Sequence, residues 1–177
     1  EHPRLSNLDS LSKLMPIVYD TGTVTAGNSS GINDGAAAIL LANEYAINKY
    51  SLKPLARIIG STTAGVEPKF MGIGPVPAIN KLLAHYKLKI QDIDFFEINE
   101  AFSAQVLSVV KLLGLGNSME KINPNGGAIA IGHPLGASGA RIFLTAVNNL
   151  IKTKKKYALC SMCIGVGQGI ATLIEKI

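Results

Sequence analysis

The stretch from Asn123 to Arg141 reads Asn-Pro-Asn-Gly-Gly-Ala-Ile-Ala-Ile-Gly-His-Pro-Leu-Gly-Ala-Ser-Gly-Ala-Arg. Five glycines and two prolines interrupt any regular element there, and a helical apolar pattern follows at once. Glycines this close together let the backbone approach a ligand or adopt positive φ in a turn. His133 sits in the middle, fixed by Pro134, which is typical of a catalytic group on a rigid loop. The alternative is a structural glycine-rich turn with an incidental histidine.

Outward from this loop, strand-like and helical patterns alternate along the chain. The predicted helices span 36–48, 77–87, 101–113 and 137–151, and the predicted strands span 18–26, 55–62, 93–98, 157–162 and 170–174. Asn33 and Asp34 are N-cap candidates for the first helix. The polar segment 1–16, bounded by Pro3 and Pro16, reads as an arm. The alternation predicts an α/β fold, a sheet covered by helices.

Composition sets the broad class of the protein. The chain has 177 residues, of which 47% are hydrophobic and 16% charged, and this fits one domain with a sizeable core. No apolar run approaches the roughly 18 residues of a membrane span. Glu1 stands where an initiator Met is expected and no signal or transit pattern follows, so we expect a longer natural chain. Two unpaired thiols without a targeting segment favour the cytoplasm.

The formal net charge of +5 raises the question of a nucleic-acid partner. The only dense basic run, residues 152–156, ends a predicted helix, where the helix dipole favours cations. No aromatic residue interleaves this run, so bases would have nothing to stack on. We therefore interpret the run as a solvated helix end and expect neither a nucleic-acid nor a membrane partner.

A polar turn, Asn99-Glu-Ala-Phe102, follows the predicted strand at 93–98. Polar side chains at the carboxyl end of such a strand face the crevice in which open α/β sheets bind ligands. Asn99 could donate a hydrogen bond or hold a water there. Its spacing alone favours the plainer alternative, that it caps the following helix.

The third candidate is Cys163-Ile-Gly-Val-Gly-Gln-Gly169, where a cysteine leaves a strand into a glycine turn. Its thiolate could act as a base or nucleophile, with backbone N–H groups of the turn as oxyanion donors. A buried free cysteine that behaves as a small hydrophobe is the alternative. The three alternating glycines match a dinucleotide fingerprint only weakly, because no helix follows them.

Cys160 and Cys163 form a Cys-x-x-Cys pair, which calls for metal and redox interpretations to be weighed. A zinc site needs a second ligand pair, and the chain holds only these two cysteines. Cys160 lies inside a predicted strand, where residues three apart point to opposite faces. The sequence therefore predicts no metal site and no redox dithiol.

Taken together, these segments resemble the thiolase family. Asn-Glu-Ala-Phe at 99–102, Gly-His-Pro at 132–134 and Cys-x-Gly at 163–165 resemble its three C-terminal active-site motifs. Thr-Val-Thr-Ala-Gly-Asn-x-Ser-Gly at 23–31 and Met-Gly-x-Gly-Pro at 71–75 are similar to two further stretches. The similarity is greatest to the acetyl-CoA acetyltransferase and 3-ketoacyl-CoA thiolase branch, and it implies the C-terminal half of that fold, with a mixed five-stranded sheet.

The resemblance implies a Claisen condensation of two acetyl-CoA units or the reverse thiolysis, with coenzyme A as substrate or product and no further cofactor. Cys163 would be the α-proton base. His133 would activate the nucleophilic thiol and, with a water held by Asn99, stabilise the enolate oxygen, while Gly165 N–H would hold an oxyanion. Four positions match those that line the pantetheine tunnel: Ser30, Met71, Ala101 and Phe102.

The chain also departs from the family pattern. The acylated cysteine belongs to an N-terminal half that is absent, and Val166 replaces a glycine common in the turn after Cys163. We expect an arm at 1–16 and a C-terminal domain at 17–177 that needs the missing half for turnover, within a full-length enzyme that is a homo-oligomer. Two rival classes are a non-catalytic acyl-CoA-binding module and a structural half-domain. A nucleotide oxidoreductase is a distant third.

Overall fold

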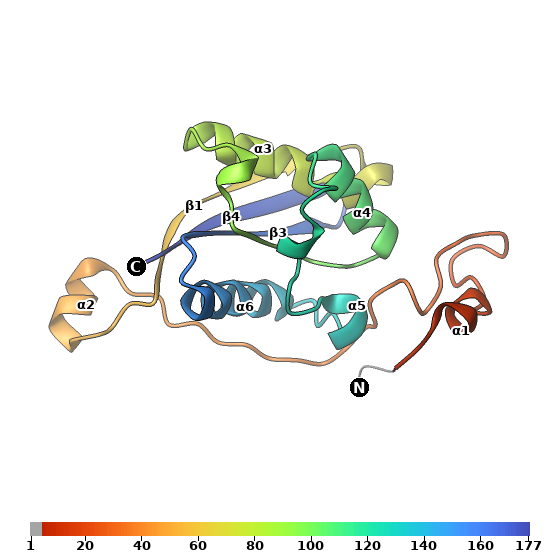
Figure 1. Cartoon of the computed structure of the whole chain (residues 1–177), viewed down its shortest axis with the longest axis horizontal. Helices are drawn as coiled ribbons and strands as arrows, with labels where there is room; N and C mark the ends of the chain where they lie inside the picture. The colour runs from red at the N-terminus through yellow and green to blue at the C-terminus, as the bar shows by residue number, and fades with distance from the viewer. Residues whose placement is uncertain (1–4) are drawn as a thin grey trace.

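Four strands form one mixed sheet in the order β1-β4-β3-β2 in the computed structural model, which describes residues 5–177 (Figure 1). The strands are β1 (Ala56–Gly65), β2 (Phe95–Ile98), β3 (Tyr157–Ile164) and β4 (Gln168–Lys176). β4 pairs antiparallel with both β1 and β3, whereas β2 runs parallel to β3. The predicted mixed sheet is thus confirmed, but it has four strands where five were expected.

Helices cover both faces of this sheet. α3 (Pro75–His85) and α4 (Ser103–Leu112) lie on one face, and α6 (Ser138–Thr153) lies on the other (Figure 1). Three predicted helices, 77–87, 101–113 and 137–151, correspond to these elements and are confirmed. The remaining short elements are α1 (Leu8–Ser12), α2 (Glu44–Tyr50), α5 (Ala128–Ile131) and the 3₁₀ helices η1 (Pro68–Ile73), η2 (Ile90–Asp92) and η3 (Met119–Lys121).

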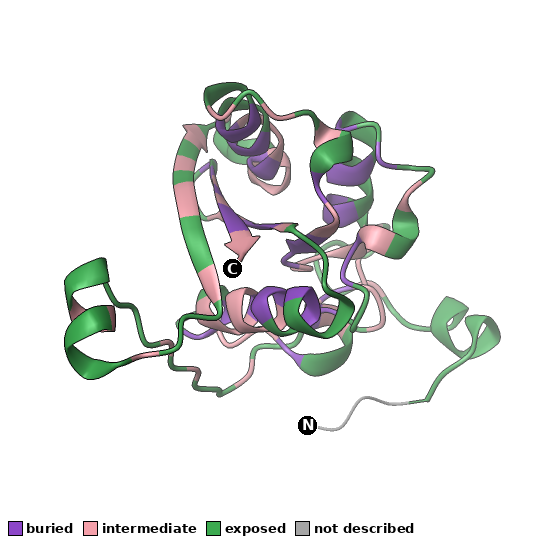
Figure 2. Ribbon diagram, turned by 60° about the vertical axis from the view of Figure 1, so that its left-hand side comes forward, coloured by how far each residue is buried: buried purple, intermediate pink, exposed green. Residues whose placement is uncertain are grey.

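Two apolar clusters form the core, one on each side of the sheet. The larger cluster joins α3 and α4 to residues such as Phe96 and Leu159. The smaller joins α6 to Ala158, Cys160 and Ile174. In Figure 2 the buried positions follow the inward sides of these helices and the strands between them. Since β3 is covered on both faces, its sequence is an almost unbroken apolar run.

The predicted strand at 18–26 is wrong. This segment folds back on itself, with a single isolated bridge between Pro16 and Thr25, and no strand pairs along it. The Asn28 side chain accepts a hydrogen bond from Thr25 N and donates one to Thr23 O, both at 2.8 Å. A side chain that occupies backbone groups in this way favours a turn over a sheet ladder.

The predicted helix at 36–48 is also wrong, because only α2 at its end forms. Asn33 does not cap a helix. Its side chain instead accepts a hydrogen bond from His133 N at 3.1 Å. Gly35 lies so close to Pro134 that a Cβ there would stand 2.6 Å from the proline ring. These contacts hold the chain extended ahead of the alanine run, and tertiary contact overrides helix propensity.

The segment before β1 lies on the outside of the fold. The chain from α1 to α2 runs along the side of α6 and α5 that faces away from the sheet (Figure 1). The first four residues of the predicted arm lie outside the described residues. Within residues 5–177, no helix has the length and apolar content needed to cross a bilayer.

Gly169 in β4 faces the kink between η1 and α3, where no side chain fits. A Cβ on Gly169 would collide with the backbone of Gly74 and Pro75, which cannot move aside as a flexible side chain would. We expect Gly169→Ala to destabilise the fold by about 1–3 kcal/mol, the usual cost of overpacking. Urea unfolding measures it, with Gly116→Ala as control because open space surrounds that glycine. Equal stability of the two variants would contradict this packing argument.

Candidate active site

The carboxyl ends of β2 and β3 bring two of the predicted site residues to one edge of the sheet. Asn99 follows β2 directly, and its backbone N–H donates to Ser161 O on β3 at 2.9 Å. Cys163 lies two residues beyond Ser161 on β3. Because the two strands are parallel, this edge is the place where an open α/β sheet binds ligands.

The His133 loop connects α5 to α6 and closes over the same edge. His133 N–H lies between two acceptors, Asn33 Oδ1 at 3.1 Å and Gly31 O at 3.3 Å. Gly132 has φ +98°, a backbone conformation that residues other than glycine rarely adopt. Pro134 follows directly and fixes the loop on its other side. His133 thus lies on a loop held by these contacts, and its catalytic role stays a prediction.

A line of hydrogen bonds runs through the imidazole of His133. Asn99 Nδ2 lies 3.1 Å from His133 Nε2, and Ser138 Oγ lies 2.6 Å from His133 Nδ1. Ser138 Oγ also donates to Pro134 O at 3.0 Å. Asn99 therefore does not cap α4, since its amide points to the histidine. Its Oδ1 atom is buried and finds no partner among the described residues, which leaves one acceptor in the site.

Asn123 and Glu100 hold the turn that carries Asn99. The Asn123 side chain accepts from Ile98 N at 2.8 Å and donates to Ile98 O at 2.9 Å, as a neighbouring strand would. It also donates to Glu100 Oε1 at 2.7 Å, and Glu100 Oε2 accepts from Ile129 N at 3.2 Å. The backbone of the turn is thus fixed from both sides, which orients Asn99.

The environment of His133 keeps its imidazole neutral. Burial lowers its pKa below the ordinary value of 6.5, and the positive charge of Arg141 lowers it further. A neutral imidazole has one unprotonated ring nitrogen, so it can accept a proton near neutral pH. His133 therefore fits the part of a general base.

The two cysteines differ sharply in position. Cys160 packs against α6 inside the smaller cluster, and burial and Glu97 raise its pKa. Cys163 ends β3 beside the glycine turn, on the opposite face by strand alternation, and burial raises its pKa as well. At neutral pH Cys163 is thus a protonated thiol, which can donate its proton to an acceptor. Its location at the sheet edge, which Cys160 lacks, makes it the chemically usable thiol.

The remaining predicted site residues surround this edge in two groups. Ser30 N–H donates to Ala101 O at 2.9 Å, and Phe102 bridges Ser29, so the 23–31 motif lies beside the Asn99 turn. Met71 lies in η1, which packs against α4 and β3, and is half-buried. Gly165 opens the turn after β3 with free space at its Cα.

Val166 is strained in that turn. It has φ +60°, which is a left-handed conformation, and its side chain is 80% exposed. No buried contact therefore offsets the cost of this conformation. A β-branched side chain is rarely found there, because its Cβ substituents crowd the backbone. This is the residue that stands where the family commonly has a glycine, and glycine adopts such a conformation without strain.

A second polar cluster lies beneath the His133 site, between β2 and α6. Glu97 is 1% exposed, and neither of its oxygens finds a hydrogen-bond partner in the described part of the chain. Burial raises the pKa of Glu97 to about 7, against the opposing charge of Arg141 and with a further rise from Glu100. Arg141 Nη2 is also buried and, within residues 5–177, unpartnered.

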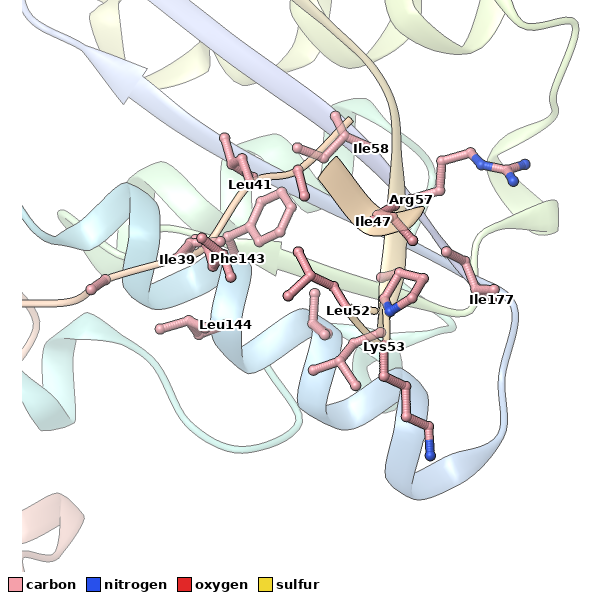
Figure 3. Close-up of a pocket in the computed structure, with 17 residues that line it drawn as sticks. Ile39, Leu41, Ile47, Leu52, Lys53, Arg57, Ile58, Phe143, Leu144 and Ile177 are labelled. Atoms are coloured by element: carbon pink, nitrogen blue, oxygen red, sulfur yellow. The ribbon is translucent and has the colours of Figure 1, made fainter. Parts of the chain in front are cut away.

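A cavity of about 520 Å³ lies away from these residues. It is bounded by segment 38–42, the start of β1 and the outer side of α6 (Figure 3). Leu41, Leu52 and Phe143 are among the mainly apolar side chains that line it. None of the predicted site residues borders it. We therefore place the candidate site at the sheet edge, where the hydrogen-bonding groups converge.

Among residues 5–177, no three histidine, cysteine or acidic side chains lie close enough together to hold a metal ion.

Sequence reasoning missed several residues that build the site. Ser138 and Asn123 lie in the quoted glycine-rich stretch, yet their side chains carried no recognisable pattern. Asn123 has φ +45°, and asparagine tolerates this left-handed conformation better than most residues. That tolerance was the one available signal. Asn33 was noticed, but as a helix cap, because its true partner lies 100 residues away in sequence.

Comparison with known proteins gives consistent matches along the whole chain. A family model described as the thiolase C-terminal domain matches residues 52–176, and one described as the thiolase N-terminal domain matches residues 1–45. The beta-ketoadipyl-CoA thiolase of Acinetobacter baylyi is 57% identical over 178 residues, which cover 100% of this chain and 44% of that protein.

Solved structures agree. The crystal structure of the Bacillus anthracis acetyl-CoA acetyltransferase superposes with a TM-score of 0.95 at 45% identity, covering 100% of this chain and 45% of that one. The crystal structure of human mitochondrial 3-ketoacyl-CoA thiolase in complex with CoA superposes with a TM-score of 0.91 at 45% identity. The match covers 100% of this chain and 45% of that one. The chain thus spans less than half the length of these relatives.

The two family models meet between residues 45 and 52, later than the predicted boundary after residue 16. Residues 1–45 are therefore similar to part of the N-terminal domain of the family. The division into an arm and a domain stays a prediction.

Glu97 should make stability depend on pH. Its pKa is about 7 when folded against 4.5 as the reference value, so the folded state binds the proton more tightly. The contribution of Glu97 to the free energy of unfolding is fully present below pH 4.5 and is lost as the pH rises through about 7. We expect Glu97→Gln to be more stable than the unaltered chain above that range, by up to about 3 kcal/mol.

Urea unfolding across this pH range checks the Glu97 prediction. Glu120→Gln, which removes a carboxylate from an exposed position, is the matched control. A stability difference between Glu97→Gln and the unaltered chain that stays constant with pH would contradict the prediction.

Replacing Val166 should relieve strain. Asparagine adopts positive φ more readily than valine, and the side chain makes no buried contact to lose. We therefore expect Val166→Asn to raise the free energy of unfolding by about 1 kcal/mol. Val166→Gly should gain less, because glycine also increases the entropy of the unfolded chain. Thermal unfolding of both variants measures this, and a destabilised Val166→Asn would refute the strain argument.

Proposed function

We propose, since this chain belongs to the thiolase family, that it supplies the acid/base half of a thiolase active site. The reaction would be thiolysis of a 3-oxoacyl-CoA by CoA, or the reverse Claisen condensation. The observation that carries this proposal is the neutral His133, held by Asn99 and Ser138 at the sheet edge on which Cys163 lies.

Cys163 serves as the acid in thiolysis and as the base in condensation. A nucleophilic cysteine, carried by a part of the longer protein outside these residues, attacks the 3-oxo carbon of the substrate. The bond between the 2 and 3 carbons breaks, and its electron pair leaves with acetyl-CoA as an enolate. The protonated thiol of Cys163 gives its proton to the enolate carbon. It then regains a proton from the thiol of incoming CoA, whose sulfur attacks the acyl-enzyme.

His133 handles the proton of the nucleophilic cysteine. Its unprotonated ring nitrogen takes that proton as the thiol attacks, and it returns the proton when CoA displaces the enzyme thiolate. In the charged state, its N–H and a water held by Asn99 stabilise the enolate oxygen. The unpartnered Oδ1 of Asn99 supports this role, since a buried acceptor requires a hydrogen-bond donor.

Backbone and apolar groups complete the proposed site. Gly165 N–H holds the oxyanion of the acyl-enzyme step, and the open space at its Cα leaves room for the acyl group. Ser30, Met71, Ala101 and Phe102 line the tunnel for the pantetheine arm. Their support is their position around the Asn99 turn and η1, together with partial burial, which suits a long thin ligand.

The favoured substrate is 3-oxoadipyl-CoA. Its support is the 57% identity to the Acinetobacter baylyi beta-ketoadipyl-CoA thiolase, against 45% to the Bacillus anthracis acetyl-CoA acetyltransferase. Acetoacetyl-CoA is the second candidate, supported by the TM-score of 0.95 to the latter protein. Neither substrate requires a metal or organic cofactor, because CoA itself is the reacting partner.

The whole enzyme requires further chain. Both family models match, yet the relatives are more than twice as long, so we infer that the rest of an N-terminal half completes the site. We further propose a homo-oligomer in the cytoplasm for that longer protein. A non-catalytic acyl-CoA-binding module stays the alternative, and it predicts acyl-CoA binding that survives loss of the Cys163 thiol.

Loss of the Cys163 thiol tests the function. In the longer protein that contains these residues, we expect Cys163→Ser to lower thiolysis by about 10²–10⁴-fold, the range for a general acid. Cys160→Ser is the matched control, because its thiol is packed in the core. CoA-dependent cleavage of 3-oxoadipyl-CoA and acetoacetyl-CoA provides the measurement.

Four outcomes separate the alternatives. A higher kcat/KM with 3-oxoadipyl-CoA supports the favoured substrate, and the opposite order supports the second candidate. Acyl-CoA binding without turnover in any form supports the binding module. Turnover by the 177-residue chain alone would overturn the role given to the missing half.

A further inference from the structure

Ser138 has two hydrogen-bond partners that compete for its single hydroxyl proton. It is the first residue of α6 and is completely buried. Its Oγ lies 2.6 Å from His133 Nδ1 and 3.0 Å from Pro134 O. A carbonyl oxygen can only accept, so a hydroxyl that donates to Pro134 must accept from the other partner. His133 then carries its proton on Nδ1.

The opposite side of the imidazole gives the same assignment. Asn99 Nδ2 lies 3.1 Å from His133 Nε2, and an amide nitrogen only donates. Nε2 must therefore present a lone pair, which again places the proton on Nδ1. The two contacts arise from different elements, the turn after β2 and the start of α6, and they select the same tautomer.

We propose that Ser138 is a positioning residue that holds His133 in the Nδ1–H tautomer, so that Nε2 alone accepts and returns protons. In the charged state Nδ1–H keeps its bond to Ser138 Oγ, and the second proton sits on Nε2, from which the Asn99 Nδ2 donor must then turn away. The hydroxyl proton of Ser138 stays directed at Pro134 O throughout. Only one atom of the ring thus exchanges protons with its surroundings. The consequence for catalysis rests on the proposed function, whereas the tautomer does not.

Without the Ser138 hydroxyl, His133 should no longer be held in the Nδ1–H tautomer. In Ser138→Ala the Nδ1–H group would face a methyl group, and no other side chain of the described residues hydrogen-bonds Nδ1. An unpaired buried donor is costly, so Nδ1 loses its proton and the ring shifts to the Nε2–H tautomer, with the Asn99 amide rotated so that its unpartnered Oδ1 accepts from Nε2–H. The imidazolium, which needs an acceptor at both nitrogens, is destabilised as well, and the pKa of His133 falls further.

Two-bond ¹H–¹⁵N correlation spectra of the ¹⁵N-labelled 177-residue chain, recorded above the pKa of His133, test the proposal. The imidazole nitrogen that carries hydrogen is distinguished by its ¹⁵N shift. His85→Gln and His2→Gln variants assign the signals. We expect the unaltered chain to show Nδ1–H, Ser138→Ala to lose most of that population, and Ser138→Thr, which keeps a hydroxyl, to restore it.

Thr145→Val is the matched control. Thr145 Oγ1 donates to Arg141 O at 3.0 Å on the same helix, so this variant removes an equivalent backbone contact without touching His133. It should retain the Nδ1–H spectrum. An Nε2–H spectrum in the unaltered chain, or undiminished Nδ1–H in Ser138→Ala, would overturn the proposal. Should Ser138→Ala fail to fold, the unaltered chain and Ser138→Thr decide it.

Activity of the longer protein separates this inference from the proposed function. There we expect Ser138→Ala to lower kcat by about tenfold to a thousandfold with little change in KM, because the base would present the wrong nitrogen. Ser138→Thr should recover part of this loss. An Nδ1–H spectrum in a protein without thiolysis would contradict the function and leave the tautomer assignment standing. Unchanged kcat in Ser138→Ala would remove the catalytic consequence.

Discussion

The hydrogen bond from Asn99 N to Ser161 O, which continues the parallel pairing of β2 and β3, fixes the geometry on which the site depends. It sets the carboxyl ends of two strands side by side, so that one delivers an amide and the other a thiol to the same edge. Asn123 then closes β2 from its free side with hydrogen bonds to Ile98. The Asn123 side chain thus pairs with backbone groups of β2 that a fifth strand would otherwise occupy. This holds the outer edge of the four-stranded sheet in place.

Buried polar groups without partners lie on both sides of the sheet. On the α6 side they are Asn99 Oδ1, both oxygens of Glu97, Arg141 Nη2 and Asn149 Nδ2, all without partners in the portion of the chain described. On the other side both polar side-chain atoms of Gln105 in α4 are unpartnered, although the cluster there is otherwise apolar. Buried polar atoms are normally satisfied, and each exception costs free energy.

The sequence predicted the elements whose patterns are local and missed those whose conformation depends on distant contacts. α3 and α6 show apolar residues at helical spacing and were found within a few residues of their ends. The run at 36–42 has equal helix propensity, yet Asn33 and Gly35 bind it to the His133 loop and no helix forms there. A single sequence does not reveal such a contact across 100 residues.

The same distinction holds for the site. His133, Cys163 and Asn99 stood out because glycine turns and strand ends mark them locally. Ser138 and Asn123 did not, since a serine at a helix start and an asparagine in a turn are ordinary. Only the three-dimensional structure shows which ring nitrogen the serine contacts. Their placement illustrates that reactive groups are easier to recognise from sequence than the residues that orient them.

The opposed faces of Cys160 and Cys163 have a consequence for the lifetime of the reactive thiol. A disulfide requires the two Cβ atoms to approach within about 4.5 Å, and side chains on opposite sides of a strand point apart. These are the only cysteines in the chain. If an oxidant converts Cys163 to a sulfenic acid, the chain offers no resolving cysteine to capture it. Its repair then takes two thiols from outside these residues, such as two molecules of CoA. The first forms a mixed disulfide with Cys163 and releases water, and the second frees the Cys163 thiol and leaves a disulfide of the two external thiols.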